Sequence, residues 1–146
     1  MKNFLEQQAI NYILPVDIKI STVHFNGFPD LIVQLNGSII HKNTATKQIT
    51  LKSCISIKSS MSLVVTMFNK KYSASKESAI IIESVTVDGI EIIPCFNHLT
   101  EYNTDIGPGN STNYLGRNGT WKLTTNAPFY NWLHMHTGQG WLLTPT

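Results

Sequence analysis

Apolar and polar residues alternate along much of the chain between residues 16 and 92. Val16, Ile18 and Ile20 alternate with polar residues, and the same period of two returns at residues 31–35 and 49–58. Successive side chains of an extended strand point to opposite faces, so this pattern predicts strands with one apolar and one polar face. Residues 63–68 are almost continuously apolar, which predicts a strand covered on both faces.

Two dipeptides divide these segments into hairpins. Asn36-Gly37 follows the strand predicted at residues 31–35, and Asp88-Gly89 lies between β-branched residues at 79–87 and 90–92. Both central positions of a type I′ turn need positive φ, which Asn, Asp and Gly adopt most readily. The sequence therefore predicts two tight hairpins, with residues 38–41 as the return strand of the first.

The first fourteen residues have a different pattern. Pro15 ends a segment in which apolar residues recur at roughly helical spacing: Phe4, Leu5, Ala9, Tyr12 and Ile13. This segment is predicted to be a short helix that covers one end of the domain, or an arm that docks on a neighbouring subunit. The predicted fold is all-β: the helix or arm at 1–14, then a single antiparallel β-sandwich or jelly roll of about seven to nine strands at 15–146.

Residues 97–118 are rich in Asn, Gly, Thr and Ser, with Gly107-Pro108-Gly109 near the centre. A loop of this length is expected to be functional or mobile. Glu101, Asn103 and Asp105 alternate within it, and oxygen ligands at such spacing can bind calcium. Two carboxylates and one amide make a thin ligand set, so a solvated loop is the favoured interpretation.

The C-terminal segment holds large aromatic residues in unusual number: Trp121, Phe129, Tyr130, Trp132 and Trp141. Half or more of these rings are expected in the core. One or two exposed rings would mark a binding surface, because aromatic faces stack on sugar rings and also anchor protein interfaces. Phe4 and Leu5 are the corresponding contact candidates in the N-terminal segment.

Composition narrows the function. The 146 residues suit one domain, 42% of them are hydrophobic, 14% are charged, and the formal net charge is +2. Nucleic acid is not an expected partner, because no basic stripe is present to neutralise phosphates. No apolar segment is long enough to span a bilayer, and no secretion signal is visible, so synthesis in the cytoplasm without membrane contact is expected.

Catalytic and metal-binding motifs are weak. On a strand, His134 and His136 would share a face and could hold one metal, with His98 or His24 as a third ligand. A cupin-like site of this kind needs a nearby downstream carboxylate, and residues 137–140 have none. Glu101 and Asp105 are the other weak metal candidates. No motif for nucleophilic catalysis or phosphate binding is present, so a non-enzymatic protein without a cofactor is expected.

The two cysteines, Cys54 and Cys95, permit one disulfide or none. Cys54 lies within an alternating strand pattern, and Cys95 follows a predicted strand end. A lone cysteine behaves as a small hydrophobic residue, so two buried free thiols are expected.

A resemblance to a known family appears between residues 63 and 92. The segments L-V-V-T-M-F-N-K-K-Y and A-I-I-I-E-S-V-T-V-D-G-I-E-I resemble the second half of small carbohydrate-binding-module-type β-sandwiches. Similar modules occur in virion proteins of tailed bacteriophages. Calcium-dependent members carry several acidic residues in the loop after the Asn. Residues 69–78 contain one acidic residue, Glu77, so the resemblance does not imply a calcium site.

This resemblance implies a structural or auxiliary component of a bacteriophage virion, in the tail, baseplate or capsid surface. Its expected partners are other virion proteins or further copies of itself in a homo-oligomer, and a surface glycan is a further candidate. The alternative function is a glycan-binding module, using exposed C-terminal aromatics with amides from residues 97–118. A second alternative is a His-based, metal-binding, cupin-like enzyme.

Overall fold

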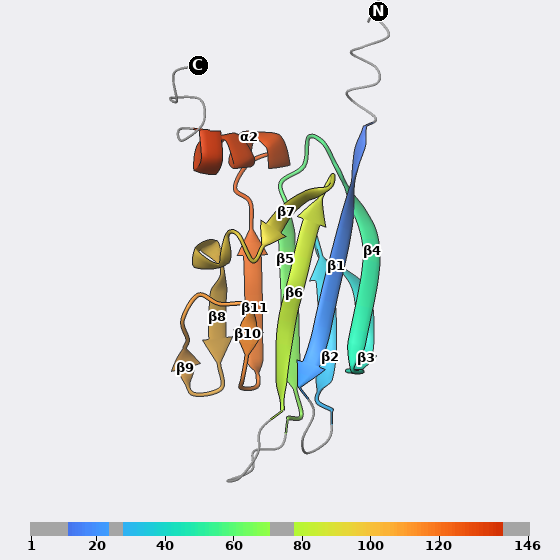
Figure 1. Cartoon of the computed structure of the whole chain (residues 1–146), viewed down its shortest axis with the longest axis vertical. Coiled ribbons are helices and arrows are strands. Elements are labelled where there is room, and N and C mark those ends of the chain that lie inside the picture. The colour runs from blue at the N-terminus through green and yellow to red at the C-terminus, as the bar shows by residue number, and fades with distance from the viewer. Residues whose placement is uncertain (1–11, 24–27, 71–77, 139–146) are drawn as a thin grey trace, which may run out of the picture.

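The computed structural model of the protein describes residues 12–23, 28–70 and 78–138. These residues form two antiparallel sheets packed face to face, so the predicted all-β sandwich is confirmed (Figure 1). Most of the predicted N-terminal helix or arm, residues 1–11, lies outside the described residues. None of the helices in the described part of the chain has the length and apolar character needed to cross a bilayer.

Sheet A has the strand order β10-β6-β1-β4, with β7 also paired to β6, and sheet B has the order β3-β2-β5-β11-β8-β9. The strands of sheet A are β1 (Ile13–Val23), β4 (Gln48–Ser56), β6 (Ala79–Val87), β7 (Ile90–Ile93) and β10 (Tyr114–Leu115). Those of sheet B are β2 (Asp30–Leu35), β3 (Ser38–Thr44), β5 (Ser62–Phe68), β8 (Glu101–Thr104), β9 (Gly107–Pro108) and β11 (Gly119–Thr124).

The alternating apolar residues of the sequence face the core, and the polar residues between them lie on the outer faces of the sheets. In β1, Val16, Ile18 and Ile20 are at most 1% exposed, while the residues between them face outward. The prediction that residues 63–68 form a strand covered on both faces is wrong. In β5, burial alternates, and Val64 and Phe68 remain partly exposed. Only one face of β5 packs into the core, because it lies within a sandwich of two sheets and not between two layers.

Both predicted tight turns are confirmed. Asn36 and Gly37 have φ values of 50° and 83°, and Asp88 and Gly89 have φ values of 52° and 77°. Positive φ at both central residues is the type I′ geometry, which matches the twist of the flanking strands.

Residues 97–118 are not the single long loop that the sequence predicts. They form a short 3₁₀ turn, η1 (Asn97–Leu99), followed by β8, β9 and β10. Strand β8 pairs with β11 and β10 pairs with β6, so this polar segment extends both sheets. Tyr102 and Leu115 supply its buried hydrophobic side chains, at 7% and 0% exposure. Tertiary pairing here overrides weak local strand propensity.

After β11 the chain forms α2 (Phe129–Leu133) and one π-helical turn, η2 (His134–Gly138), which lie across one end of the sandwich (Figure 1). The side chain of Trp132, a residue of α2, is buried. Its ring centroid lies 5.3 Å from that of Phe96 and 6.3 Å from that of Phe129. The aromatic C-terminal segment thus closes one end of the core.

Candidate functional site

Three of the predicted aromatic contact residues cannot form a binding surface. Trp121 and Phe129 are 0% exposed and Trp132 is 2% exposed. The Trp121 indole nitrogen donates a hydrogen bond to the Thr112 carbonyl oxygen at 2.6 Å, inside the fold. Burial of half or more of the aromatic rings was expected, but the sequence does not show which of them are covered.

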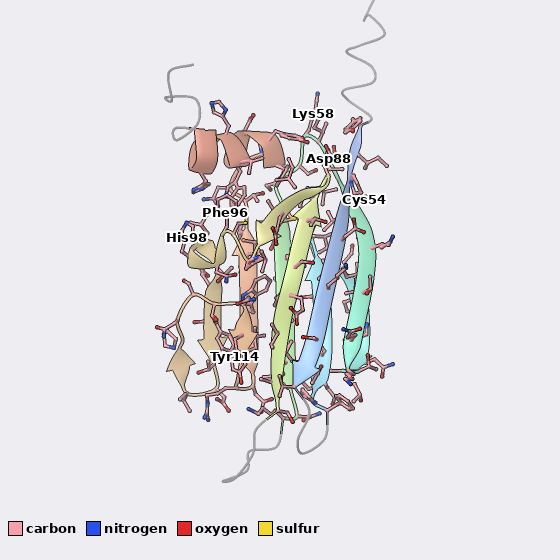
Figure 2. The ribbon with its side chains drawn as sticks, viewed as in Figure 1. Cys54, Lys58, Asp88, Phe96, His98 and Tyr114 are labelled. Atoms are coloured by element: carbon pink, nitrogen blue, oxygen red, sulfur yellow. The ribbon has the colours of Figure 1, made fainter. Side chains whose placement is uncertain are left out.

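Tyr130 is the exception, with 38% exposure. Its hydroxyl donates a hydrogen bond to the Asp88 carboxylate, and this bond, with smaller contributions from burial, Asp88 charge and Tyr12, raises the pKa of Tyr130 to about 12. The contact ties α2 to the turn between β6 and β7, whose position Figure 2 marks at Asp88. The remaining predicted contact residues, Phe4, Leu5 and Trp141, lie outside the described residues.

The strand geometry assumed for His134 and His136 is wrong. Both lie in the helical turn η2, and residues two apart on a helix do not share a face. His136 and Glu101 instead line one small hollow of about 170 Å³ between sheet B and the helical segment. Lys122 lines it too, and its ammonium opposes a bound cation. Within the described residues, no group of three or more His, Cys, Asp or Glu side chains is placed to hold a metal ion.

The two cysteines are also placed differently from the prediction. Both are free thiols, and both are exposed. The register pairs Cys54 with Pro15, so that its side chain points to the outer face of sheet A while Ile55 points into the core. The Cys95 sulfur lies 3.8 Å from a Glu91 carboxylate oxygen.

A hollow with mixed aromatic and polar walls lies on the outer face of sheet B, at the end opposite to α2 (Figure 1). Its volume is about 260 Å³, and we name it the Phe68 hollow. The register brings its residues together, because Asp30 pairs with Thr44 on one side and with Phe68 on the other. Its lining residues are Asp30, Lys42, Asn43, Thr44 and Phe68.

The Asp30 carboxylate is fixed in this hollow by a hydrogen bond to each oxygen. The Asn69 amide donates to Oδ2 at 2.7 Å, and the Thr44 hydroxyl donates to Oδ1 at 2.8 Å. These bonds favour the charged form, and they hold the pKa of Asp30 below its ordinary value of 3.8, with the Asn69 bond as the larger cause. Each oxygen still has acceptor capacity for a ligand.

Two donors stand beside this carboxylate. Asn43 uses its amide oxygen to accept a hydrogen bond from the Thr44 backbone at 2.8 Å. Among the described residues, its amide nitrogen and the Lys42 ammonium have no hydrogen-bond partner. Opposite charges on Asp30 and Lys42 leave the hollow with no net charge.

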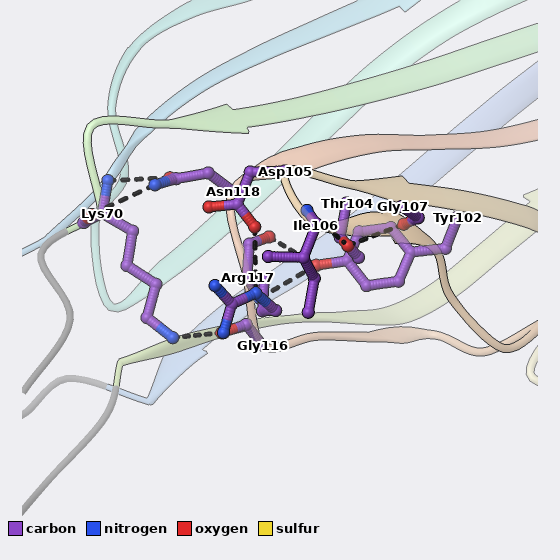
Figure 3. Close-up of polar contacts among 9 residues, drawn as sticks. All are labelled: Lys70, Tyr102, Thr104, Asp105, Ile106, Gly107, Gly116, Arg117 and Asn118. Carbon is purple, nitrogen blue, oxygen red and sulfur yellow. Dashed lines mark hydrogen bonds and ion pairs between the residues drawn. The ribbon is translucent and has the colours of Figure 1, made fainter. Parts of the chain in front are cut away.

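The end of β5 is held by a bracket from the loop before β11, shown in Figure 3. The Lys70 backbone N–H donates to the Asn118 side-chain oxygen at 2.8 Å, and the Asn118 amide donates back to the Lys70 carbonyl at 3.1 Å. The Lys70 side chain is 5% exposed, and its ammonium donates to the Gly116 carbonyl. Between Phe68 and Lys70, Asn69 has a φ of 59°, a left-handed conformation that Asn tolerates better than most residues.

The bracket is itself supported from β8 (Figure 3). The Tyr102 hydroxyl donates to the Arg117 carbonyl and accepts from the Arg117 backbone N–H at 2.9 Å. The Arg117 guanidinium pairs with Asp105 at 2.9 Å, which engages the carboxylate considered above as a metal ligand. A Cβ at position 119 would overlap the backbone oxygen of Asn103, so Gly119 permits this close approach of β11 to β8.

Sequence reasoning missed the residues of the Phe68 hollow. Phe68 and Asn69 lie at the end of the strand predicted at residues 63–68, and Asp30 directly precedes the strand predicted at residues 31–35. Asp30 and Asn69 are 39 residues apart, and only the pairing of β2 with β5 makes them neighbours.

No family model matches the chain, and no curated protein matches it. Two solved chains are similar to it, each at 15% sequence identity and a TM-score of 0.49. One is vCBM60 in complex with galactobiose, with 74% of this chain and 95% of that chain covered. The other is a selenomethionine form of vCBM60, described as linking two families of calcium-dependent carbohydrate-binding modules by circular permutation, with 75% and 88% covered. These low-identity likenesses assign no ligand to the present chain.

Proposed function

We propose that the protein binds carbohydrate and that the Phe68 hollow is its binding site. The Phe68 ring carries this proposal, because it is partly exposed beside a fixed carboxylate, an amide and an ammonium group. A binding pocket typically combines an apolar wall with a few convergent polar groups that fix orientation. The hollow has this composition at the scale of one sugar unit.

The chemistry of a sugar ring fits both walls. Its apolar C–H face packs on the Phe68 ring, which contributes buried area and a negative face for the C–H groups. Its hydroxyls donate to the Asp30 carboxylate and accept from the Asn43 amide and the Lys42 ammonium. Because the charges of Asp30 and Lys42 cancel, a neutral sugar suits the hollow better than a polyanion.

The role in a bacteriophage virion, with other virion proteins or further copies of the chain as partners, stays a prediction. It is compatible with a carbohydrate-binding surface but does not follow from one.

A glycan array tests the proposal, followed by titration of the best ligand into variants. Phe68→Ala removes the apolar wall and is expected to weaken binding about ten- to a hundredfold, the range for an aromatic anchor. Ile39→Ala is the matched control, since Ile39 is also an apolar residue on sheet B and is 54% exposed outside the hollow. A Phe68→Ala protein that binds as tightly as the Ile39→Ala protein would refute the assignment.

A further inference from the structure

A second hollow lies on the outer face of sheet A, over β1, β6 and the edge strand β4; sheet A is the nearer sheet in Figure 1. Its volume is about 440 Å³, and we name it the Glu83 groove. Its lining residues are Lys19, Ile20, Ser21, Gln48, Ile49, Thr50 and Glu83. We infer that this groove is a second carbohydrate site, which binds an extended neutral glycan chain independently of the Phe68 hollow.

A β-bulge builds the groove. In the pairing of β6 with β1, Ile82 is opposite Ile20 and Ser84 is opposite Lys19, so Glu83 is an extra residue without a partner. Glu83 and Ser84 consequently both face outward, although they are consecutive. Bulges bend a strand and re-aim side chains, and they occur preferentially beside functional sites.

The bulge places a fixed carboxylate over the sheet. The Ser21 hydroxyl donates a hydrogen bond to Glu83 Oε1 at 2.5 Å, which holds the side chain across β1 and leaves Oε2 open. In the described part of the chain, the side chains of Lys19, Gln48 and Thr50 have no hydrogen-bond partner. Apart from the bond between Ser21 and Glu83, the donors and acceptors of this hollow do not satisfy one another.

The chemistry of these groups selects the ligand class. Backbone groups of paired strands lie in the plane of the sheet, so recognition on its outer face comes from side chains. The two lining isoleucines, Ile20 and Ile49, are 1% and 7% exposed, so the groove offers no apolar anchor of the kind that protein partners need. Glu83 and Lys19 balance each other in charge, which disfavours a polyanion such as nucleic acid. Hydroxyl groups both donate and accept, and a neutral sugar is dense in them.

Beyond the groove, a row of residues on the same face of sheet A leads to an exposed aromatic residue. The register aligns Gln48, Ser21, Ile81 and Tyr114 in one row across four strands. Tyr114 is 49% exposed, and Figure 2 shows it toward the β10 edge of the sheet. Three strand spacings of roughly 4.8 Å give the row a length of about 14 Å. A site of this length suits several linked sugars rather than one.

This inference shares with the proposed function the premise that the ligand is a neutral glycan, so the test must separate the two sites. Cellohexaose, xylohexaose and mannohexaose are titrated into the isotope-labelled full chain, and backbone amide shifts are followed by NMR. Shifts at Ser21, Thr50 and Glu83 that persist in the Phe68→Ala protein are expected. Shifts confined to the Phe68 hollow would overturn the second site alone, and shifts confined to the groove would overturn the first alone. If these sugars shift no amide at the Phe68 hollow and none at the Glu83 groove, both site assignments are overturned.

Two variants and a control assign the groove contacts. Gln48→Ala removes a side chain with no other described hydrogen bond, and it is expected to weaken groove binding about fivefold without loss of folding. Tyr114→Ala is expected to weaken binding of the hexasaccharide but not of the corresponding disaccharide, because only the longer chain reaches the row's end. Thr86→Ala is the control, on the same outer face of β6 but outside the groove. Equal groove affinity in all three proteins would overturn the inference.

Discussion

The Phe68 hollow and the Glu83 groove lie on opposite outer faces of the sandwich, yet they are built from similar parts. Each contains one carboxylate that accepts a hydrogen bond from a hydroxyl of the neighbouring strand: Thr44 to Asp30 at 2.8 Å, and Ser21 to Glu83 at 2.5 Å. Each also has an amide side chain, and a lysine with no partner among the described residues. The polar chemistry is therefore shared.

The two sites differ in what holds them. The Phe68 hollow is at strand ends, and its geometry depends on the side-chain bracket of Lys70 and Asn118. The Glu83 groove lies over paired strands, where the ladder of the inner strands β1 and β6 with the edge strand β4 fixes it. Strand ends and loops open locally at lower free energy than central strands. Changes outside the site should thus disturb the hollow far more than the groove.

The largest expected effect comes from removing both sites. The Phe68→Ala/Glu83→Ala protein should bind an insoluble polysaccharide at least about a hundredfold more weakly than the wild-type protein, because two linked contacts act with a high effective concentration. Depletion from solution by the polysaccharide measures this. If the double variant binds the polysaccharide as tightly as the Phe68→Ala protein, the groove does not contribute to binding.

Loss of the bracket should affect one site only. Asn118→Ala removes both hydrogen bonds to the Lys70 backbone, and we expect it to lower the free energy of unfolding by about 1–2 kcal/mol. Binding in the Phe68 hollow should weaken about tenfold, while groove binding is unchanged. Urea denaturation and NMR titration provide the two measurements. Asn103→Ala is the matched control, on β8 with an exposed side chain. Equal weakening at both sites would contradict the difference in support.

Deleting Glu83 should remove the groove and leave the fold. Without this residue, β6 reads as regular alternation through Ile82, Ser84 and Val85, and every buried side chain keeps its face. We expect a change in unfolding free energy within about 1 kcal/mol, loss of groove shifts, and an intact Phe68 hollow. Deleting Thr86 instead would turn apolar side chains outward and should abolish folding. Retained groove binding after deletion of Glu83 would contradict the role of the bulge.

The smallest expected effect is on the titration of Asp30. Asn69→Gly keeps the left-handed backbone but removes the amide donor, so the pKa of Asp30 should rise toward its ordinary value, and Thr44→Val should raise it less. Carboxyl carbon shifts in an NMR titration report both. Because the folded pKa is lowered, the stabilising contribution of this carboxylate is present above about pH 3.8 and is lost as the pH falls through the lowered value. An unchanged pKa of Asp30 in the Asn69→Gly protein would show that the Asn69 hydrogen bond does not lower this pKa.

The sequence by itself determined the local features of the protein. Alternation at residues 16–21, 31–35 and 49–58 predicted strands that the structure contains. A period of two predicts a strand because successive side chains of an extended backbone point to opposite faces. The two hairpins followed from the positive φ that Asn36-Gly37 and Asp88-Gly89 can adopt. Even the bulge left a local trace, since Glu83 and Ser84 are consecutive polar residues within an apolar alternation.

Only the tertiary structure decided which residues meet. Composition identified the C-terminal aromatics but not that Trp121 and Trp132 are buried, because exposure depends on what another element covers. Ser21 and Glu83 are 62 residues apart, and the pairing of β1 with β6 makes them partners. Sheet order and register are set by the summed packing of many side chains, and no short segment encodes them. Both candidate sites are products of that register.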